Sequence, residues 1–295
     1  MITLPIIEKI CSHIQIPAVG IAPWPLPEES RQILTDPEPC PFTESNIELR
    51  LQGTPPFTPK SAIVLLFPYY VDYDGPTNLS RYTWGPDYHL VVRHYLEYLG
   101  AELKNLAPTM DYEIHCDTSP LADRYLAYLA GLGFYGKNHC FINPTFGSYV
   151  LIGTLLTNLD LPPATPMNQS CMGCNTCITA CPGQSLGHTY FKYTACKKKK
   201  KKKKGNLPLP EQNIIKKTPL LFGCDICQTV CPHNDGIPET PIPEFKEIKP
   251  ILPVNTIWSI TNKEFKSTYG HRAFSWRGKQ ILLRNDEYIN EKKDR

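Results

Sequence analysis

The sequence lacks the features that would place it in a membrane or on the secretory pathway. None of its apolar runs approaches the roughly 20 residues that a membrane-spanning helix needs. The longest strong run, SAIVLLFPYYV at 61–71, is typical of a buried strand. The first residues, MITLPIIEKICSHI, contain no basic leader followed by an apolar stretch. We therefore expect a cytoplasmic protein with no membrane partner.

The sequence also has little net charge. Its formal charge is +3, and eight lysines form one run at 197–204, so the rest of the chain is slightly acidic. Global charge is thus a weak argument for nucleic-acid binding. A block of like charges is usually solvated, so we expect the lysine run to form a surface loop. A phosphate-binding patch and an artefact of the sequence are the alternatives.

Proline and cysteine are the residues present in excess. The 30 prolines in 295 residues are about twice the usual share, which predicts many irregular connections. Twelve cysteines without an export signal favour reduced thiols or metal sites over disulfides. Four of these cysteines are scattered and are interpreted as small buried apolar residues: Cys11, Cys40, Cys116 and Cys140.

Apolar periodicity predicts alternating strands and helices in the first half of the chain. The expected elements are strands at 61–70, 111–117 and 147–161, and helices at 87–103 and 119–133. Thr118 or Ser119 is expected to cap the second helix. Such alternation predicts an α/β domain. The expected domains are an α/β domain at 1–165, a small cysteine-rich domain at 166–240 and a partly helical segment at 241–295.

Two cysteine runs carry the strongest chemical signal. CMGCNTCITACP at 171–182 has the spacing of a bacterial two-cluster ferredoxin, whose fourth cysteine ligates the other [4Fe–4S] cluster. CDICQTVCP at 224–232 repeats this pattern with one early cysteine missing, and Cys196 is the only cysteine between the runs. The crossed assignment gives Cys171, Cys174, Cys177 and Cys231 to one cluster, and Cys181, Cys196, Cys224 and Cys227 to the other. Zinc is the alternative, but its sites do not call for two runs that end in Cys-Pro.

The electron acceptor is not indicated by a dinucleotide-binding motif. GLGFYG at 131–136 has the letters of a G-x-G-x-x-G fingerprint, but it follows a predicted helix instead of opening one. We therefore reject it as a nucleotide site. The clusters are expected to carry electrons to a different acceptor.

Several long segments resemble the epoxyqueuosine reductase family. They are SRYTWGPDYHLVVRHYLEYL at 80–99, DTSPLADRYLAYLAGLGFYGKNHCFINPTFGSYVLIGTLLTNL at 117–159, LFGCDICQTVCPHN at 221–234 and WRGKQILLRN at 276–285. The resemblance implies an α+β or α/β fold: a nitroreductase-like domain that binds base-off cobalamin, a 2[4Fe–4S] ferredoxin-like domain and a short C-terminal helical tail. It also implies reduction of the epoxide of epoxyqueuosine to queuosine at the tRNA wobble position.

The resemblance implies roles for individual residues. Asp117 matches the family's position for the acid that protonates the opened epoxide, and its pKa would have to be raised by burial against the corrin. An N-cap or turn role is the alternative. His89 is not expected to ligate cobalt, and Asp123 matches an acidic family position or is only a helix N-terminal carboxylate. The candidate cofactor contacts are Tyr82, Asp87, Tyr88, His89, Ser119, Gly133, Lys137, Asn138, Asn143 and Ser148.

The resemblance also implies partners: tRNA with epoxyqueuosine at the wobble position and a low-potential electron donor such as a ferredoxin or flavodoxin. A monomer is expected. Two departures stand out: the lysine run follows Cys196, and the sequence stops soon after WRGKQILLRN, where many members continue into a helical-repeat extension that grips tRNA. The alternatives are a cobalamin-dependent reductase of a small molecule, such as an organohalide, and a non-enzymatic electron-transfer ferredoxin.

Overall fold

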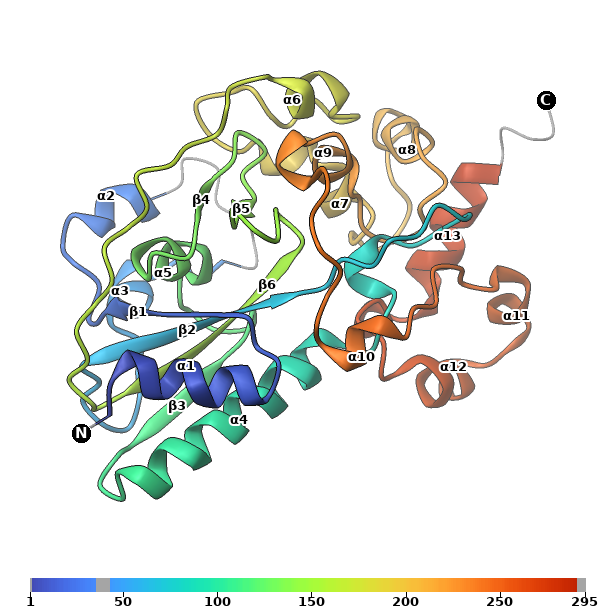
Figure 1. The fold of residues 1–295 in the computed structure, drawn as a ribbon. Coiled ribbons are helices and arrows are strands. Elements are labelled where there is room, and N and C mark those ends of the chain that lie inside the picture. The colour runs from blue at the N-terminus through green and yellow to red at the C-terminus, as the bar shows by residue number, and fades with distance from the viewer. Residues whose placement is uncertain (1, 36–42, 291–295) are drawn as a thin grey trace.

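A four-stranded antiparallel sheet forms the centre of the molecule (Figure 1). The computed structural model describes residues 2–35 and 43–290, so Cys40 lies outside the described residues. The strand order is β1-β2-β6-β3, and each neighbouring pair is antiparallel. The strands are β1 (Ala18–Pro23), β2 (Ser61–Pro68), β3 (Tyr112–His115) and β6 (Val150–Thr157). The predicted mixture of helices and strands is confirmed, and β1 is a strand that the periodicity did not predict.

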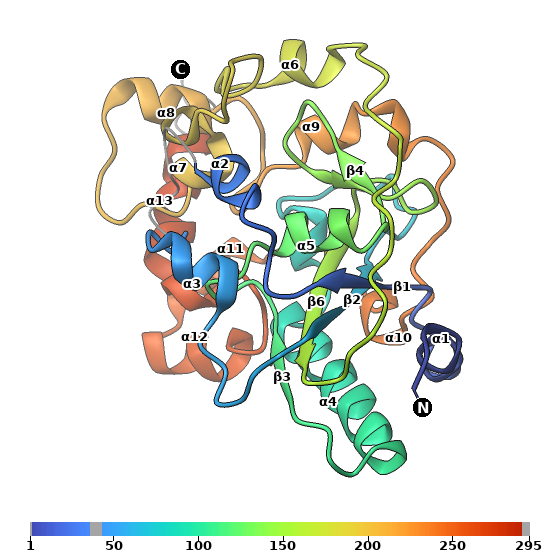
Figure 2. The same cartoon turned by 90° about the vertical axis from the view of Figure 1, so that its left-hand side faces the viewer.

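Helices cover both faces of the sheet (Figure 2), and β2 explains why. Every residue of β2 is buried, and consecutive side chains of a strand point to opposite faces. Ile63, Leu65 and Phe67 join the apolar cluster that contains α1 and α4, whereas Val64 and Leu66 join the one that contains α3 and α5. These helices are α1 (Leu4–His13), α3 (Ile47–Gln52), α4 (Tyr88–Leu106) and α5 (Asp123–Leu129). Each fully buried aliphatic side chain contributes roughly 1.5–3 kcal/mol.

The start of α5 differs from the prediction. Its N-cap is Ala122, so the expected cap at Thr118 or Ser119 is wrong. Asp117 has a φ of 56°, and the Ser119 hydroxyl accepts a hydrogen bond from the Leu121 N–H over 3.3 Å. The chain therefore makes a tight polar turn before the helix begins, and this turn presents Asp117.

The cysteine region packs against a short hairpin, whose Asn138 donates a hydrogen bond to the Cys227 carbonyl. The hairpin strands are β4 (Phe134–Tyr135) and β5 (Phe141–Ile142). The helices of the region are α6 (Thr176–Ala180), η2 (Tyr193–Ala195), α7 (Lys197–Lys200), α8 (Leu209–Ile215), α9 (Ile226–Thr229) and η3 (Pro232–Asn234). α6 and α9, which hold Cys177 and Cys227, pack against each other. The two cysteine runs are thereby brought together.

The C-terminal segment packs against both the cysteine region and the loop before α4. Its helices are α10 (Pro243–Lys246), α11 (Val254–Ser259), α12 (Asn262–Tyr269), η4 (Ser275–Arg277) and α13 (Lys279–Asn290); the remaining elements are α2 (Ser30–Leu34) and η1 (Arg81–Thr83). One apolar cluster joins Leu79 and Trp84 to Phe222 and Ile281. The helical tail is confirmed, while the proposed domain boundaries stay a prediction. Among the described helices, none combines the length and apolarity needed to cross a membrane.

The lysine run is not the surface loop that its composition predicts. Lys197–Lys200 form α7, and Lys197, Lys200 and Lys201 are buried. The Lys197 ammonium donates to Thr218 Oγ1 over 2.6 Å, and Lys200 pairs with Glu211 over 3.3 Å. Long aliphatic stems let these side chains fill apolar space while the charged ends find oxygen partners. Only the end of the run, Lys203 and Lys204, is exposed.

Candidate functional site

Asp117 lies on the connection that leaves β3 and leads to α5. Its φ of 56° is in the left-handed region, where residues other than glycine are uncommon. Tyr88 Oη donates a hydrogen bond to Asp117 Oδ2 over 2.5 Å, and His89 Nε2 lies 3.3 Å from the same oxygen. Two side chains from the start of α4 therefore converge on one carboxylate oxygen at the end of the sheet.

The first turn of α4 fixes His89 between two carboxylates. Asp87 is the N-cap residue: its Oδ1 accepts the His89 backbone N–H over 3.1 Å and lies 2.7 Å from His89 Nδ1. Burial acts to lower the pKa of His89, but the Asp117 and Asp87 carboxylates outweigh it and raise the pKa to about 9. The ring is thus an imidazolium near neutral pH with a carboxylate at each nitrogen. This arrangement supports the prediction that His89 does not ligate cobalt.

The electrostatics of Asp117 are opposite to the expectation from the sequence. The ion pair with His89, helped by the hydrogen bond from Tyr88, holds the pKa of Asp117 well below its usual value against the opposing effect of burial. The side chain is 63% exposed, so burial cannot dominate. The protein residues alone therefore lower this pKa, and the expected rise by burial against the corrin stays a prediction. The carboxylate is ionised, and the proton of the pair resides on His89.

Tyr82 and Lys198 extend this site toward the cysteine region. The Tyr82 ring lies 6.3 Å from the Tyr88 ring, and Lys198 Nζ lies 4.3 Å from the centre of the Tyr82 ring. Burial raises the pKa of Tyr82 to about 12. Burial acts to lower the pKa of Lys198, but Tyr82, Asp225 and Asp117 reverse this and raise it. The lysine run therefore brings a cation toward Asp117, which its sequence did not indicate.

A second carboxyl group lies behind the Asp117 turn. Asp123, at the first position of α5, has an Oδ1 atom that is buried and has no hydrogen-bond partner in the described structure. Burial, followed by the charge of Asp117, raises the pKa of Asp123 to about 7. The sequence left this residue as either an acidic family position or a helix N-terminal carboxylate, because nothing in its spacing reveals the burial.

The other candidate cofactor contacts make hydrogen bonds within the protein. Asn143 Nδ2 donates to the Leu132 carbonyl over 2.7 Å, and Asn138 Nδ2 donates to the Cys227 carbonyl over 3.2 Å. The Ser148 hydroxyl accepts from Asn234 Nδ2 over 3.0 Å. Lys137 Nζ donates to Asn175 Oδ1 over 2.8 Å. These residues join the β4–β5 hairpin and β6 to the cysteine region, and Gly133 permits the close approach of the Ile142 carbonyl. Their roles in cofactor binding stay predictions.

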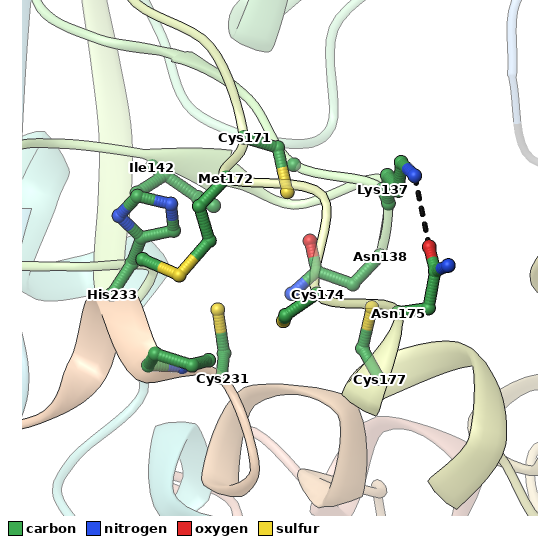
Figure 3. Close-up of a pocket in the computed structure, with 12 residues that line it drawn as sticks. Lys137, Asn138, Ile142, Cys171, Met172, Cys174, Asn175, Cys177, Cys231 and His233 are labelled. Carbon is green, nitrogen blue, oxygen red and sulfur yellow. Dashed lines mark hydrogen bonds between the residues drawn. The ribbon is translucent and has the colours of Figure 1, made fainter.

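Four cysteines line one pocket between the cysteine region and the hairpin (Figure 3). Cys171, Cys174, Cys177 and Cys231 surround it together with Lys137, Asn138, Met172 and His233. The first three come from the first cysteine run, and Cys231 comes from the end of the second. This is the set that the crossed assignment predicts for one cluster.

The other four predicted ligands lie on neighbouring segments. The charges of Cys224 and Cys196 both act on Cys227, so these three thiols are near one another. The backbone just after Cys181 runs close to the backbone just before Cys196. At Gly183 the two segments are so near that a Cβ would lie 2.0 Å from the Ala195 carbonyl oxygen. All eleven described cysteines are free thiols. Cys11 and Cys116 are buried as predicted, whereas Cys140 is only half-buried and is within hydrogen-bond reach of Cys227.

A separate cavity of about 730 Å³ opens where β1 begins. Its lining includes Gln15, Val19, Leu132 and Asn143, and among the predicted contacts only Asn143 belongs to it. This volume is in the range of small-molecule sites. Within the described ranges, no three His, Cys, Asp or Glu side chains converge closely enough to hold a single metal ion.

Two family models match the chain. The model described as "4Fe-4S double cluster binding domain" matches residues 170–234. The model described as "Epoxyqueuosine reductase QueG, DUF1730" matches residues 57–118. The first match covers all eight predicted ligands, and the second ends just after Asp117.

Curated relatives and solved structures agree with these matches. An epoxyqueuosine reductase of Bacillus cereus is 41% identical over 212 residues, which are 70% of this chain and 54% of the relative. One of Staphylococcus aureus is 35% identical over 83% of this chain and 67% of the relative. The chain thus spans about half the length of the Bacillus cereus relative. A crystal structure of epoxyqueuosine reductase with an epoxyqueuosine-modified tRNA-Tyr stem loop superposes with a TM-score of 0.86, at 28% identity, over 97% of this chain and 80% of that one.

Proposed function

Because this chain belongs to the epoxyqueuosine reductase family, we propose that it reduces the epoxide of epoxyqueuosine to the alkene of queuosine at the wobble position of tRNA. The match to the Staphylococcus aureus relative over most of both chains supports this activity. So does the structural likeness to a reductase that holds an epoxyqueuosine-modified stem loop. The relatives do not favour a small-molecule reductase or a non-enzymatic ferredoxin.

The observation that best supports this proposal is that the acidic site around Asp117 lies next to the region that matches a double-cluster domain. Residues 170–234 form a domain of the type that binds two [4Fe–4S] clusters. We propose that Cys171, Cys174, Cys177 and Cys231 hold one cluster, and that Cys181, Cys196, Cys224 and Cys227 hold the other. The single pocket lined by the first four thiols supports the crossed assignment.

Base-off cobalamin is the second proposed cofactor. The residues present fit a cobalamin without a histidine ligand, because His89 Nδ1 is held by Asp87 over 2.7 Å and Nε2 faces Asp117 Oδ2 at 3.3 Å. Tyr82 and Tyr88, beside Asp117, are proposed contacts, as is Asn143, which lines a cavity that neither tyrosine reaches. When bound, the clusters supply electrons and cobalamin supplies a nucleophilic cobalt centre.

The protein's own task is to orient the substrate base and to deliver protons. Removing the epoxide oxygen as water consumes two electrons and two protons while two C–O bonds break and one C=C bond forms. We propose that Asp117 is the group that passes a proton to the substrate oxygen, and that His89 stores this proton on Nε2, 3.3 Å from Asp117 Oδ2. Tyr88 fixes the carboxylate by its 2.5 Å hydrogen bond. General acids in such positions contribute roughly 10²–10⁴-fold to a rate.

The target base would have to be splayed out of its loop to reach Asp117. We further propose a low-potential ferredoxin or flavodoxin as electron donor, a monomeric chain and a cytoplasmic location. The tRNA substrate class supports this location, since modified tRNA is used there.

Single turnover after anaerobic loading with iron, sulfide and cobalamin tests the function. The loaded protein should convert epoxyqueuosine in tRNA to queuosine, measured by mass spectrometry of the released nucleosides. Asp117→Asn should keep its bound iron and its cobalamin spectrum, yet turn over about 10²–10⁴-fold more slowly. Asp111→Asn, at a surface carboxylate that pairs with Lys104 over 3.7 Å, is the matched control and should keep the wild-type rate. A loaded wild-type protein that leaves epoxyqueuosine unchanged contradicts the proposal, and an unchanged rate in Asp117→Asn contradicts the role of Asp117.

A further inference from the structure

Asp123 is a buried acid that the mechanism above does not use. Its Oδ1 atom is buried and has no hydrogen-bond partner among the described residues. A carboxylate that serves only to stabilise the start of a helix is normally solvated or bonded to backbone N–H groups. Asp123 makes no capping hydrogen bond to α5, whose N-cap is Ala122. Its side chain is therefore placed for something other than helix capping.

Asp123 is tied to Asp117 in two ways. The backbone N–H of Asp117 faces the Asp123 carboxyl group, and the charge of Asp117 acts on Asp123 directly. Asp117 itself has a φ of 56°, a conformation that needs support from its surroundings.

Other charged and titratable groups around Asp123 come from three elements. Arg124 is the neighbour on α5, and its guanidinium is turned to donate to the His139 carbonyl. Cys116 at the end of β3 and Tyr135 on β4 have pKa values that burial raises, to about 12 for Tyr135. These neighbours therefore keep their protons near neutral pH. With burial and Asp117 acting together, the pKa of Asp123 is about 7, so it exchanges a proton in the range where the others do not.

The number of protons that the reaction consumes indicates a role for Asp123, and this role rests on the proposed function. Conversion of the epoxide to an alkene and water takes up two protons, whereas Asp117 is ionised and His89 stores one. We propose that Asp123 is a positioning residue that anchors the Asp117 turn and holds the second proton in reserve for Asp117. His89 and Asp123 then flank Asp117 as two reservoirs, one for each proton consumed.

A pH profile of single turnover tests this role. The wild-type rate should fall as the pH rises through about 7, because Asp123 loses its proton. Asp123→Asn keeps the side-chain shape and an oxygen acceptor near the Asp117 N–H, so the variant should fold. It should react at least about tenfold more slowly and should lose the decline in rate near pH 7, which is the alkaline limb of the profile. Asp123→Glu should restore the limb, and Asp111→Asn should leave it unchanged. A profile in Asp123→Asn that keeps the wild-type limb overturns the proposal.

A second readout needs no substrate. Ionising a buried acid destabilises the fold, so wild-type stability should decline as the pH rises between the ordinary value of 3.8 and about 7. Asp123→Asn should remove this decline in urea unfolding of the cluster-loaded protein, and an identical pH slope in both proteins overturns the proposal. Failure of wild-type turnover would refute the proposed function, whereas turnover with an unaltered Asp123→Asn profile would refute only the role of Asp123.

Discussion

At the scale of single residues, the site is governed by His89. One imidazole meets Asp87 at 2.7 Å and Asp117 at 3.3 Å, and it stacks on Tyr88 with ring centres 4.0 Å apart. Its charge lowers the pKa of Asp117, and Asp117 in turn helps to raise the pKa of His89. The acid that the family position suggests is thus one half of an ion pair. We propose that the pair, and not the carboxyl alone, acts as the proton donor.

His89→Gln should lose stability in a pH-dependent way. The pKa of His89 is raised from 6.5 to about 9, so its contribution is fully present below pH 6.5 and lost as the pH rises through 9. The advantage of the wild type over His89→Gln should therefore shrink across this window, by at most about 3 kcal/mol. Urea unfolding at several pH values measures it. His94→Gln, an exposed histidine on the same helix, is the control. A gap that does not vary with pH would refute the ion pair.

At the scale of elements, the sequence predicted best where local pattern and burial coincide. The apolar run at 61–70 is β2, and the periodic segment at 87–103 is α4, capped by Asp87. Asp117 was predicted from its family position. The raised pKa of Asp123 could not be predicted, because it depends on burial that arises only when the turn after β3 folds over α5. The lysine run was predicted wrongly for a related reason. A homopolymer carries no periodicity, and its burial depends on distant partners such as Thr218 and Glu211.

Lys201 offers a test of the buried lysine helix. It is fully buried, and its ammonium donates to the carbonyls of Leu220 and Gly223. Burial holds the pKa of Lys201 well below its usual value. A lysine of this kind destabilises the fold below its ordinary pKa of 10.5, and the wild type gains stability as the pH rises toward that value.

Lys201→Met should remove this dependence. The free energy of unfolding of the variant relative to the wild type should fall between about pH 7 and about pH 10, by up to roughly 1.4 kcal/mol per pH unit. The lost bonds to two carbonyls add a constant offset that does not vary with pH. Lys204→Met, at an exposed position of the same run, should show no slope. Equal slopes in the two variants would mean that Lys201 is solvated.

At the scale of the whole molecule, the sheet and the cysteine region are held in register by a small polar network. Asn234, just after Cys231, accepts the Ser148 N–H over 2.7 Å and donates to the Ser148 hydroxyl and to the Gln228 carbonyl. Gly147, with a φ of 59°, makes room for this contact, because a Cβ there would lie 2.0 Å from Asn234 Oδ1. The network joins the start of β6 to the segment that carries Cys227 and Cys231. In the proposed function, the placement of the clusters relative to the Asp117 site depends on this alignment.

Asn234→Ala should therefore slow turnover while leaving cluster binding unchanged. Removing three hydrogen bonds, two of which link the two parts, should lower the free energy of unfolding by about 1–3 kcal/mol. The variant keeps all eight proposed ligands, so its iron content after anaerobic loading should equal that of the wild type. Single-turnover conversion should nevertheless slow, because small displacements of positioned groups reduce rates strongly. Asn206→Ala, at an exposed loop position, is the matched control. Loss of iron in parallel with loss of turnover would show that Asn234 supports the cluster itself, and not the alignment of the two parts.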